Sequence, residues 1–145
     1  MLRVRKFLRI SPARRRLFVR SWGRLAKWRV KLWIVPFRYW RNRLEQGCEA
    51  SRKEVDAPGR LEDVVWAVNS AGRYVPHATC LVRALAARDV FEHSGLSAEL
   101  RIGVARDEGG RFEAHAWLEH QGRVVMGAGD DANRFVPLPL QRRRQ

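Results

Sequence analysis

Apolar residues in the first third of the chain recur at steps of three and four, which is the period of an α-helix. The pattern begins after Ser11-Pro12, an N-cap residue followed by a proline in the first helical turn, and Pro36 ends or kinks the helix. A second, short helix is predicted from Arg38 to Glu45. The positions that define the long helix are Phe18, Trp22, Leu25, Trp28 and Leu32.

Two more helices are predicted in the middle of the chain. The first is expected to stop between Ser70 and Gly72, and Pro76 prevents it from continuing. Thr79 is a suitable N-cap for the next helix, and Gly95 follows that helix as a stop signal. The first helix is marked by Leu61, Val64, Val65 and Val68, and the second is expected to carry Leu81, Ala84, Leu85 and Arg88 on one face.

Beyond residue 97 the apolar period changes to two, which indicates half-buried strands. Residues 98–104 and 112–119 form the first two strands around a turn at 107–110, and Gln121-Gly122 leads into a third at 124–126. Residues 135–140 add at most an edge strand, because Pro137 and Pro139 exclude a central one. The second strand is expected to place Phe112, Ala114, Ala116 and Leu118 on one face and Glu113, His115, Trp117 and Glu119 on the other. Helices followed by an antiparallel meander predict an α+β fold.

Positive charge is concentrated at the N-terminal end. Residues 1–45 contain 15 of the 29 lysines and arginines and one acid, so they carry the whole net charge of +14. We divide the chain into a basic amphipathic helical segment at 1–45, a linker at 46–59 and a core at 60–145. The linker contains Gly47 and ends in Pro58-Gly59.

Composition and motifs exclude several classes of protein. The apolar run from Leu32 to Phe37 is far shorter than the roughly 20 residues of a membrane-spanning helix, and arginines interrupt any secretory signal, so we expect a cytoplasmic protein. Two cysteines do not form a disulfide framework. No histidine pair or cysteine pair has zinc-site spacing, and no glycine-rich phosphate loop is present, so we expect neither a metal nor a cofactor.

Cys80 and His115 are the candidate catalytic residues. Cys80 follows the N-cap Thr79, where the helix dipole and free backbone N–H groups favour a thiolate and can hold an oxyanion. His115 lies on a predicted strand, from which its imidazole can act as base and then as acid. The alternative for each is structural: a buried, inert thiol and a histidine that is hydrogen-bonded and idle. His77, His93 and His120 lie in turns or near helix and strand ends and are weaker candidates.

The basic segment 1–45 contains four of the six tryptophans, which leaves three functions open for it. A basic amphipathic helix with tryptophan is typical of a membrane-surface or partner-binding element. Lysine and arginine patches also bind nucleic acid. The third alternative is that the apolar stripe packs on the domain while the arginines are solvated. We expect packing combined with a peptide or protein partner, rather than nucleic acid.

Three motifs in this order resemble the leader peptidases of lasso peptide biosynthesis: Thr79–Leu85, Gly95–Val104, and Ala114–Glu119 with Gly122–Val125. The resemblance implies a transglutaminase-like, papain-related fold with Cys80 as nucleophile and His115 as base. It also implies that the enzyme removes the leader of a ribosomally made precursor peptide. A separate leader-recognition protein would deliver that leader, and a lasso cyclase would act on the product. Segment 1–45 is then a dock for one of these partners, with peripheral membrane contact as an alternative.

One departure from this family concerns the acid that orients the histidine. The family has an acidic residue about twelve positions after the histidine, where this chain has Gly127. Asp130 is the nearest acid downstream, and we select it as the third catalytic residue; a backbone carbonyl in its place, or no third group, stays open. The first hypothesis is therefore a cysteine endopeptidase. Its rivals are a non-catalytic peptide-binding module of the same fold and a membrane- or nucleic-acid-associated protein.

Overall fold

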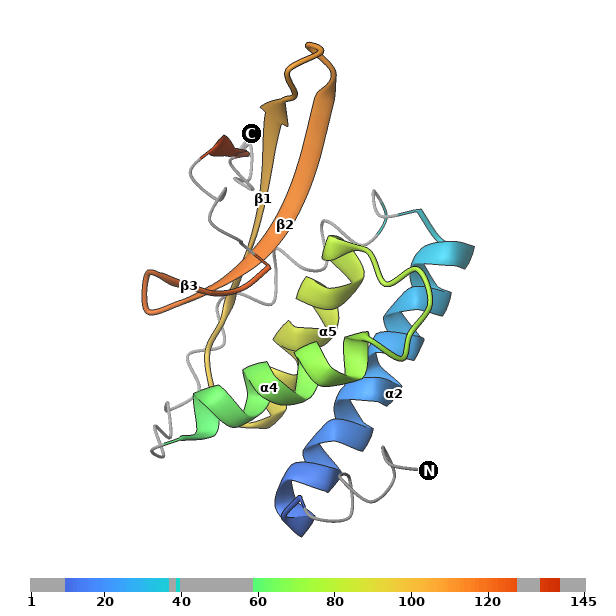
Figure 1. The fold of residues 1–145 in the computed structure, drawn as a ribbon, viewed down its shortest axis with the longest axis vertical. Helices are drawn as coiled ribbons and strands as arrows, with labels where there is room; N and C mark the ends of the chain where they lie inside the picture. The colour runs from blue at the N-terminus through green and yellow to red at the C-terminus, as the bar shows by residue number, and fades with distance from the viewer. Residues whose placement is uncertain (1–9, 37–38, 40–58, 128–133, 139–145) are drawn as a thin grey trace.

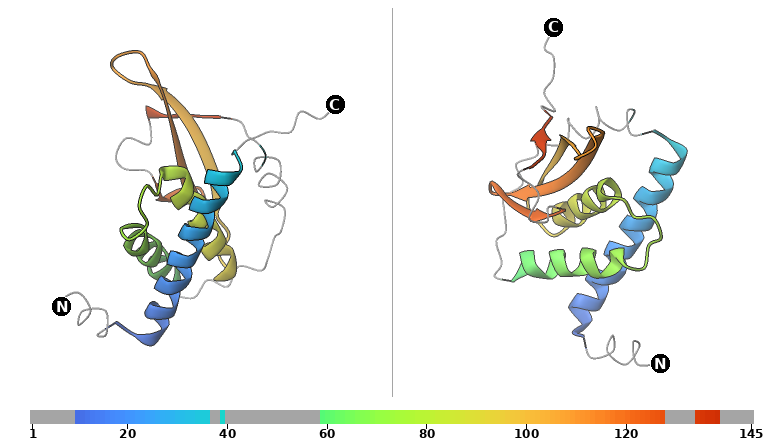
Figure 2. Two further views of the ribbon diagram at one scale, coloured as in Figure 1. Left: turned by 90° about the vertical axis from the view of Figure 1, so that its right-hand side faces the viewer. Right: turned by 45° about the horizontal axis from the view of Figure 1, so that its top comes forward.

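A computed structural model of the chain describes residues 10–36, 39, 59–127 and 134–138. Helices α2 (Pro12–Ile34), α4 (Arg60–Gly72) and α5 (Cys80–His93) precede strands β1 (Glu99–Arg106), β2 (Phe112–His120), β3 (Arg123–Met126) and β4 (Val136–Pro137). Helix α5 lies between the other two helices and the sheet, as Figures 1 and 2 show from three directions. The predicted α+β class is confirmed.

The local signals in the sequence locate the helix ends correctly. Ser11 caps α2 by accepting a hydrogen bond from the Arg14 N–H, and the helix ends just before Pro36. Gly95 has a left-handed φ of 76° directly after the C-cap of α5, as its role as a stop signal requires. Apart from Tyr39 and Gly59, the helix predicted at 38–45 and the linker predicted at 46–59 lie outside the described residues.

The four strands of the sheet are antiparallel and lie in the order β3-β2-β1-β4. The predicted meander and edge strand are both present, and β4 pairs with β1 through Val136 and Val104. Gln121 and Gly122 both have positive φ, which is the backbone of the tight turn expected between β2 and β3. A bulge between Leu118 and Glu119 then pairs Leu118 with Met126, one residue further along than an uninterrupted hairpin would place it.

The turn between β1 and β2 is held by Asp107. Its carboxylate accepts hydrogen bonds from the backbone N–H and the guanidinium of Arg111. The backbone hydrogen bond from Arg111 is the main reason that the pKa of Asp107 lies below its usual value, since it favours the charged form. This turn closes the end of the long hairpin farthest from the helices (Figure 1).

One hydrophobic core joins all three helices to one face of the sheet. Helix α5 contributes most of it, and α2 adds Leu25 and Trp28, both at most 5% exposed. Ala116 and Leu118 of β2 extend toward the same core. On the other face of the sheet, Trp117 packs with Ala105 and Phe135 in a second, smaller cluster. The α5 side chains that are almost completely buried are Val82, Ala84, Leu85, Ala86, Ala87, Val90 and Phe91.

Helix α2 departs from its predicted stripe at one position. Leu25 and Trp28 are buried and Phe18 and Leu32 pack at the edge of the core, but Trp22 is 47% exposed. The step from Phe18 to Trp22 moves around the helix away from the buried side, and Ser21 takes the inner position instead. The prediction that Trp22 belongs to the packed stripe was therefore wrong.

No helix of the described residues is long and apolar enough to cross a bilayer.

Asp89 connects α2 to α5. Its carboxylate accepts a hydrogen bond from the Trp28 indole N–H at 2.9 Å and another from Arg24 at 3.3 Å. We expect Asp89→Ala to lower the free energy of unfolding by about 1–3 kcal/mol, because a largely buried indole N–H loses its acceptor. Urea denaturation measures the change. Glu108→Ala, which removes the same charge from an exposed turn, is expected to stay within about 0.5 kcal/mol of wild type. Equal losses in the two variants would contradict this account of Asp89.

Candidate functional site

Cys80 is the first residue of α5. Thr79 caps the helix as predicted, with its hydroxyl accepting from the Val82 N–H. The Cys80 side chain packs against the edge of the core and is only partly buried. This position differs from that of an inert core cysteine, because the residue is only partly buried and lies at the positive end of the helix dipole.

The first turn of α5 leaves two backbone donors available beside the thiol. A helix begins with four N–H groups that have no partner within it. Here the Val82 N–H is bonded to the Thr79 hydroxyl, and regular helical bonding begins with the Arg83 N–H, which donates to the Thr79 carbonyl. The N–H groups of Cys80 and Leu81 have no acceptor among the described residues. They are the groups that can bind an oxyanion formed next to the sulfur.

His115 lies on β2, on the face predicted for it. Its neighbours Ala116 and Leu118 pack toward the helices, whereas His115 shares the opposite face with Trp117. The imidazole stacks on the Phe135 ring, with centroids 5.1 Å apart, and more loosely on Trp117 at 6.5 Å. Two aromatic rings therefore fix the plane of the imidazole.

The backbone carbonyl of Gly127 is the hydrogen-bond partner of His115 Nε2. Because a carbonyl can only accept, Nε2 carries the proton in the neutral ring, and Nδ1 is left with the lone pair. This is the tautomer that a general base acting through Nδ1 requires. Gly127 is the position at which the resemblance to leader peptidases predicts an acid, and the oxygen that bonds the imidazole here comes from its main chain.

The acids on the His115 face of β2 are engaged elsewhere. Glu113 forms an ion pair with Arg134, and Glu119 bonds both Arg101 and the Trp117 indole. Asp130, selected as the third catalytic residue, lies outside the described residues, so its role stays a prediction. Among the residues that are described, the group that bonds His115 is a carbonyl.

No hydrogen bond joins the Cys80 thiol to His115 within the part of the chain that the structure describes. Cys80 begins the helix that packs on the Ala116 side of β2, while His115 projects from the other side of the strand. Each residue is thus found on the element predicted for it, but the two are not linked as a bonded pair. Both catalytic assignments stay predictions.

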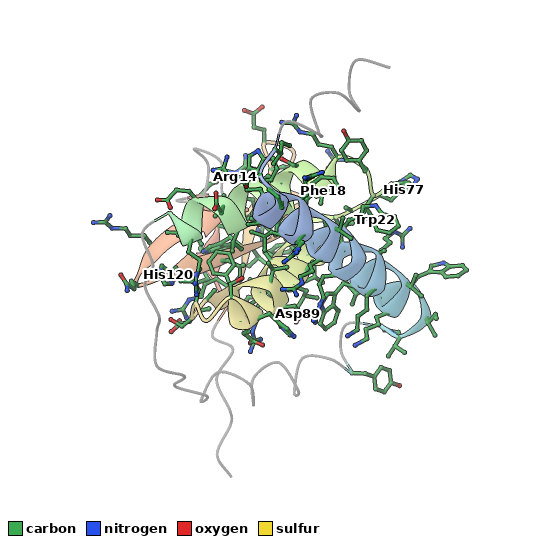
Figure 3. The ribbon with its side chains drawn as sticks, turned by 90° about the horizontal axis from the view of Figure 1, so that it is seen from below. Arg14, Phe18, Trp22, His77, Asp89 and His120 are labelled. Carbon is green, nitrogen blue, oxygen red and sulfur yellow. The ribbon has the colours of Figure 1, made fainter. Side chains whose placement is uncertain are left out.

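The other histidines have structural roles or lie apart. His120 is buried, donates a hydrogen bond from Nδ1–H to the Ser97 backbone carbonyl, and packs on Phe91. His93 bonds Arg24 and the Asp89 carbonyl at the end of α5. His77 is exposed in the turn before α5 with a φ of 54°. Figure 3 shows His77 and His120 on opposite sides of the molecule. No group of three metal-binding side chains occurs among the described residues.

Phe135 is the site residue that the sequence pattern missed. It was assigned only to the start of an edge strand, yet it covers the imidazole and belongs to the second cluster. Gly103, which pairs with His115 across β1 and β2, is also required there. A Cβ on Gly103 would lie 2.7 Å from the Trp117 ring and 3.0 Å from the Phe135 side chain. A glycine inside an alternating strand is the signal for such a close approach.

Comparison with known proteins gives one match. Residues 19–139 match the family model of the transglutaminase-like superfamily. No curated protein and no solved structure matches the chain.

The His115–Gly127 contact depends on the absence of a side chain at Gly127. Its φ is 90°, and a Cβ there would lie 2.8 Å from the Ala116 carbonyl oxygen. We therefore expect Gly127→Ala to lower the free energy of unfolding by about 1–3 kcal/mol and to displace the carbonyl from the imidazole. Long-range ¹H–¹⁵N NMR is expected to show the Nε2–H tautomer for His115 in wild type and a mixture of tautomers in the variant.

Gly23→Ala is the matched control, because Gly23 lies inside α2 with open space around its Cβ position. It is expected to raise stability by about 0.5–1 kcal/mol and to leave the His115 signals unchanged. An Nδ1–H tautomer in wild-type protein would contradict the assignment of Gly127 as the orienting group.

Proposed function

Because the chain belongs to the transglutaminase-like superfamily, we propose that it is a cysteine endopeptidase with Cys80 as nucleophile and His115 as general base. The observation that carries the proposal is the position of Cys80, a partly buried residue that begins α5, beside two N–H groups with no acceptor among the described residues. The tautomer set by Gly127 supports the role of His115.

The reaction uses these groups in a fixed order. His115 Nδ1 takes the proton of the Cys80 thiol, and the sulfur attacks the carbonyl carbon of the scissile peptide bond. The Cys80 and Leu81 N–H groups bind the oxyanion. The C–N bond then breaks, and the leaving amine takes the proton from Nδ1. Water, activated by the same nitrogen, hydrolyses the thioester and restores the thiol.

This chemistry requires the thiol and the imidazole to approach each other. Catalytic hydrogen bonds are often long or poorly aligned in free enzymes and tighten in the complex with substrate. We therefore propose that binding of the peptide substrate brings Cys80 and His115 into contact. Because the two side chains lie on opposite sides of β2 in this structure, this contact requires the imidazole to turn away from the Phe135 ring.

The substrate that we propose is a lasso precursor peptide, from which the enzyme removes the leader. Support comes from the motifs at 79–85, 95–104 and 114–119, which resemble lasso leader peptidases. The proposed partners are the precursor itself, a separate leader-recognition protein and the lasso cyclase. Cytoplasmic location follows from the same proposal, because the precursor is made and processed there.

A non-catalytic peptide-binding module is the second candidate. It is favoured by the missing bond between Cys80 and His115 and by glycine at the position where the family has an acid. Alkylation by iodoacetamide at mildly acidic pH distinguishes the two, because an activated thiolate reacts there and an ordinary thiol does not. Cys48→Ala protein, which retains Cys80 alone, is the material for this measurement.

Mass spectrometry of a lasso precursor incubated with the protein tests the peptidase, with and without the leader-recognition protein. We expect cleavage at one bond, reduced by about a thousandfold or more in Cys80→Ala and in His115→Ala. Cys48→Ala is the matched cysteine control and is expected to cleave at the wild-type rate. Unchanged cleavage by Cys80→Ala would end the proposal, and absence of cleavage in every mixture would favour the binding module.

A further inference from the structure

We propose that the outward face of α2 is a docking surface for an anionic membrane. The surface consists of an apolar stripe and the cations beside it. The stripe members are separated by steps of three, four, four and three, so they lie along one side of the helix. They are Val19, Trp22, Ala26, Val30 and Trp33.

This stripe is distinct from the one that packs on the domain. The packed stripe contains Leu25 and Trp28, and its centre lies about 130° around the helix from the centre of the outward stripe. The four larger members of the outward stripe are between 47% and 78% exposed, with Trp33 the most exposed. Ile34, at 67%, continues this apolar surface at the helix end. Packing among the described residues explains the first stripe, whereas none of the second stripe's larger side chains is buried there.

The position of α2 makes this face accessible. Figure 2 shows the helix along the outer side of the helical layer, and Figure 3 shows Trp22 on the His77 side of the molecule, away from His120. The surface is one exposed side of a single helix. Such a side fits a planar, deformable surface, into which an interfacial helix sinks its apolar side by about 5–10 Å.

The charge on α2 indicates which kind of partner surface the outward face binds. Eight of its 23 residues are lysine or arginine and none is acidic. Arg14 and Arg24 are paired with Asp63 and Asp89, but no acid among the described residues pairs with Arg16, Arg20, Lys27 or Arg29. Cations beside a tryptophan-bearing apolar stripe bind the headgroups of anionic lipids while the rings occupy the interface.

The same charge argues against a second copy of this chain as the occupant. Two such faces in contact would bring many arginines and lysines together with no acids between them, and like charges at an interface oppose association. The phosphates of duplex nucleic acid can pair with the cations, but a duplex offers no apolar surface for Trp22 and Trp33. An anionic membrane offers negative headgroups for the cations and an apolar interior for the two tryptophans.

Co-sedimentation of the full-length protein with phosphatidylcholine vesicles, with and without phosphatidylglycerol, tests the proposal. We expect binding to the anionic vesicles, weakened by raising salt from about 0.1 M to about 1 M, which shortens the screening length from roughly 10 Å to roughly 3 Å. Trp22→Ser combined with Trp33→Ser is expected to reduce partitioning by about tenfold or more. Both side chains are exposed, so the fold is retained, which circular dichroism checks.

Two matched controls separate this surface from general stickiness. Phe112→Ser removes another exposed aromatic ring, from the far end of the hairpin, and is expected to bind like wild type. Arg20→Gln with Lys27→Gln is expected to weaken anionic binding by about tenfold, whereas Arg106→Gln with Arg123→Gln removes two exposed cations elsewhere with little effect.

Several outcomes would overturn the proposal. They are no binding to anionic vesicles, unchanged binding by the double tryptophan variant, and equal losses in the two charge pairs. A dimer in sedimentation velocity that the tryptophan changes dissociate would assign the stripe to a second copy. Binding of duplex DNA that replaces vesicle binding would assign the cations to nucleic acid. None of these readouts involves peptide cleavage, so they are independent of the proposed peptidase.

Discussion

Helix α5 is buried on almost every side, and the rest of the described structure is arranged around this constraint. Seven of its side chains between Val82 and Phe91 are at most 4% exposed. A helix of this kind needs neighbours all around it, and α2, α4 and the sheet supply them. Its first residue, Cys80, is the point where the buried helix reaches the edge of the core. The site and the core are therefore positioned by the same element.

The sequence predicted element types well because their signals are local. Ser11-Pro12, Thr79, Gly95 and the turn at 121–122 each act within a few residues, and the structure has a cap or turn at each. Predictions of burial were poorer. A one-sided stripe was expected for α5, which is buried all around, and for α2, where Trp22 faces outward. The sequence period shows which sides of a helix are apolar. Tertiary packing decides which of those sides is buried.

In the candidate site, too, the features set by local signals were predicted and those set by tertiary packing were not. Motifs located Cys80 and His115 on their elements, because helix starts and strand alternation are local features. The partner of His115 was not fixed by sequence, since it depends on register, and the bulge at Leu118–Glu119 shifts β3 by one residue. A main-chain carbonyl also leaves no signature in the side-chain sequence, apart from the glycine that permits the close approach at Gly127. Phe135 reaches the imidazole through β4 pairing across β1, which periodicity cannot reveal.

The distance along the chain between α2 and its partners has a consequence for biosynthesis. Trp28 and the carboxylate that receives its indole N–H are 61 residues apart, so α2 leaves the ribosome well before α5 exists. During that interval both of its apolar stripes are uncovered, and long-range closure of this kind slows folding. The dense positive charge of α2 repels other nascent chains and so opposes aggregation until α5 has been synthesised and covers the packed side of α2.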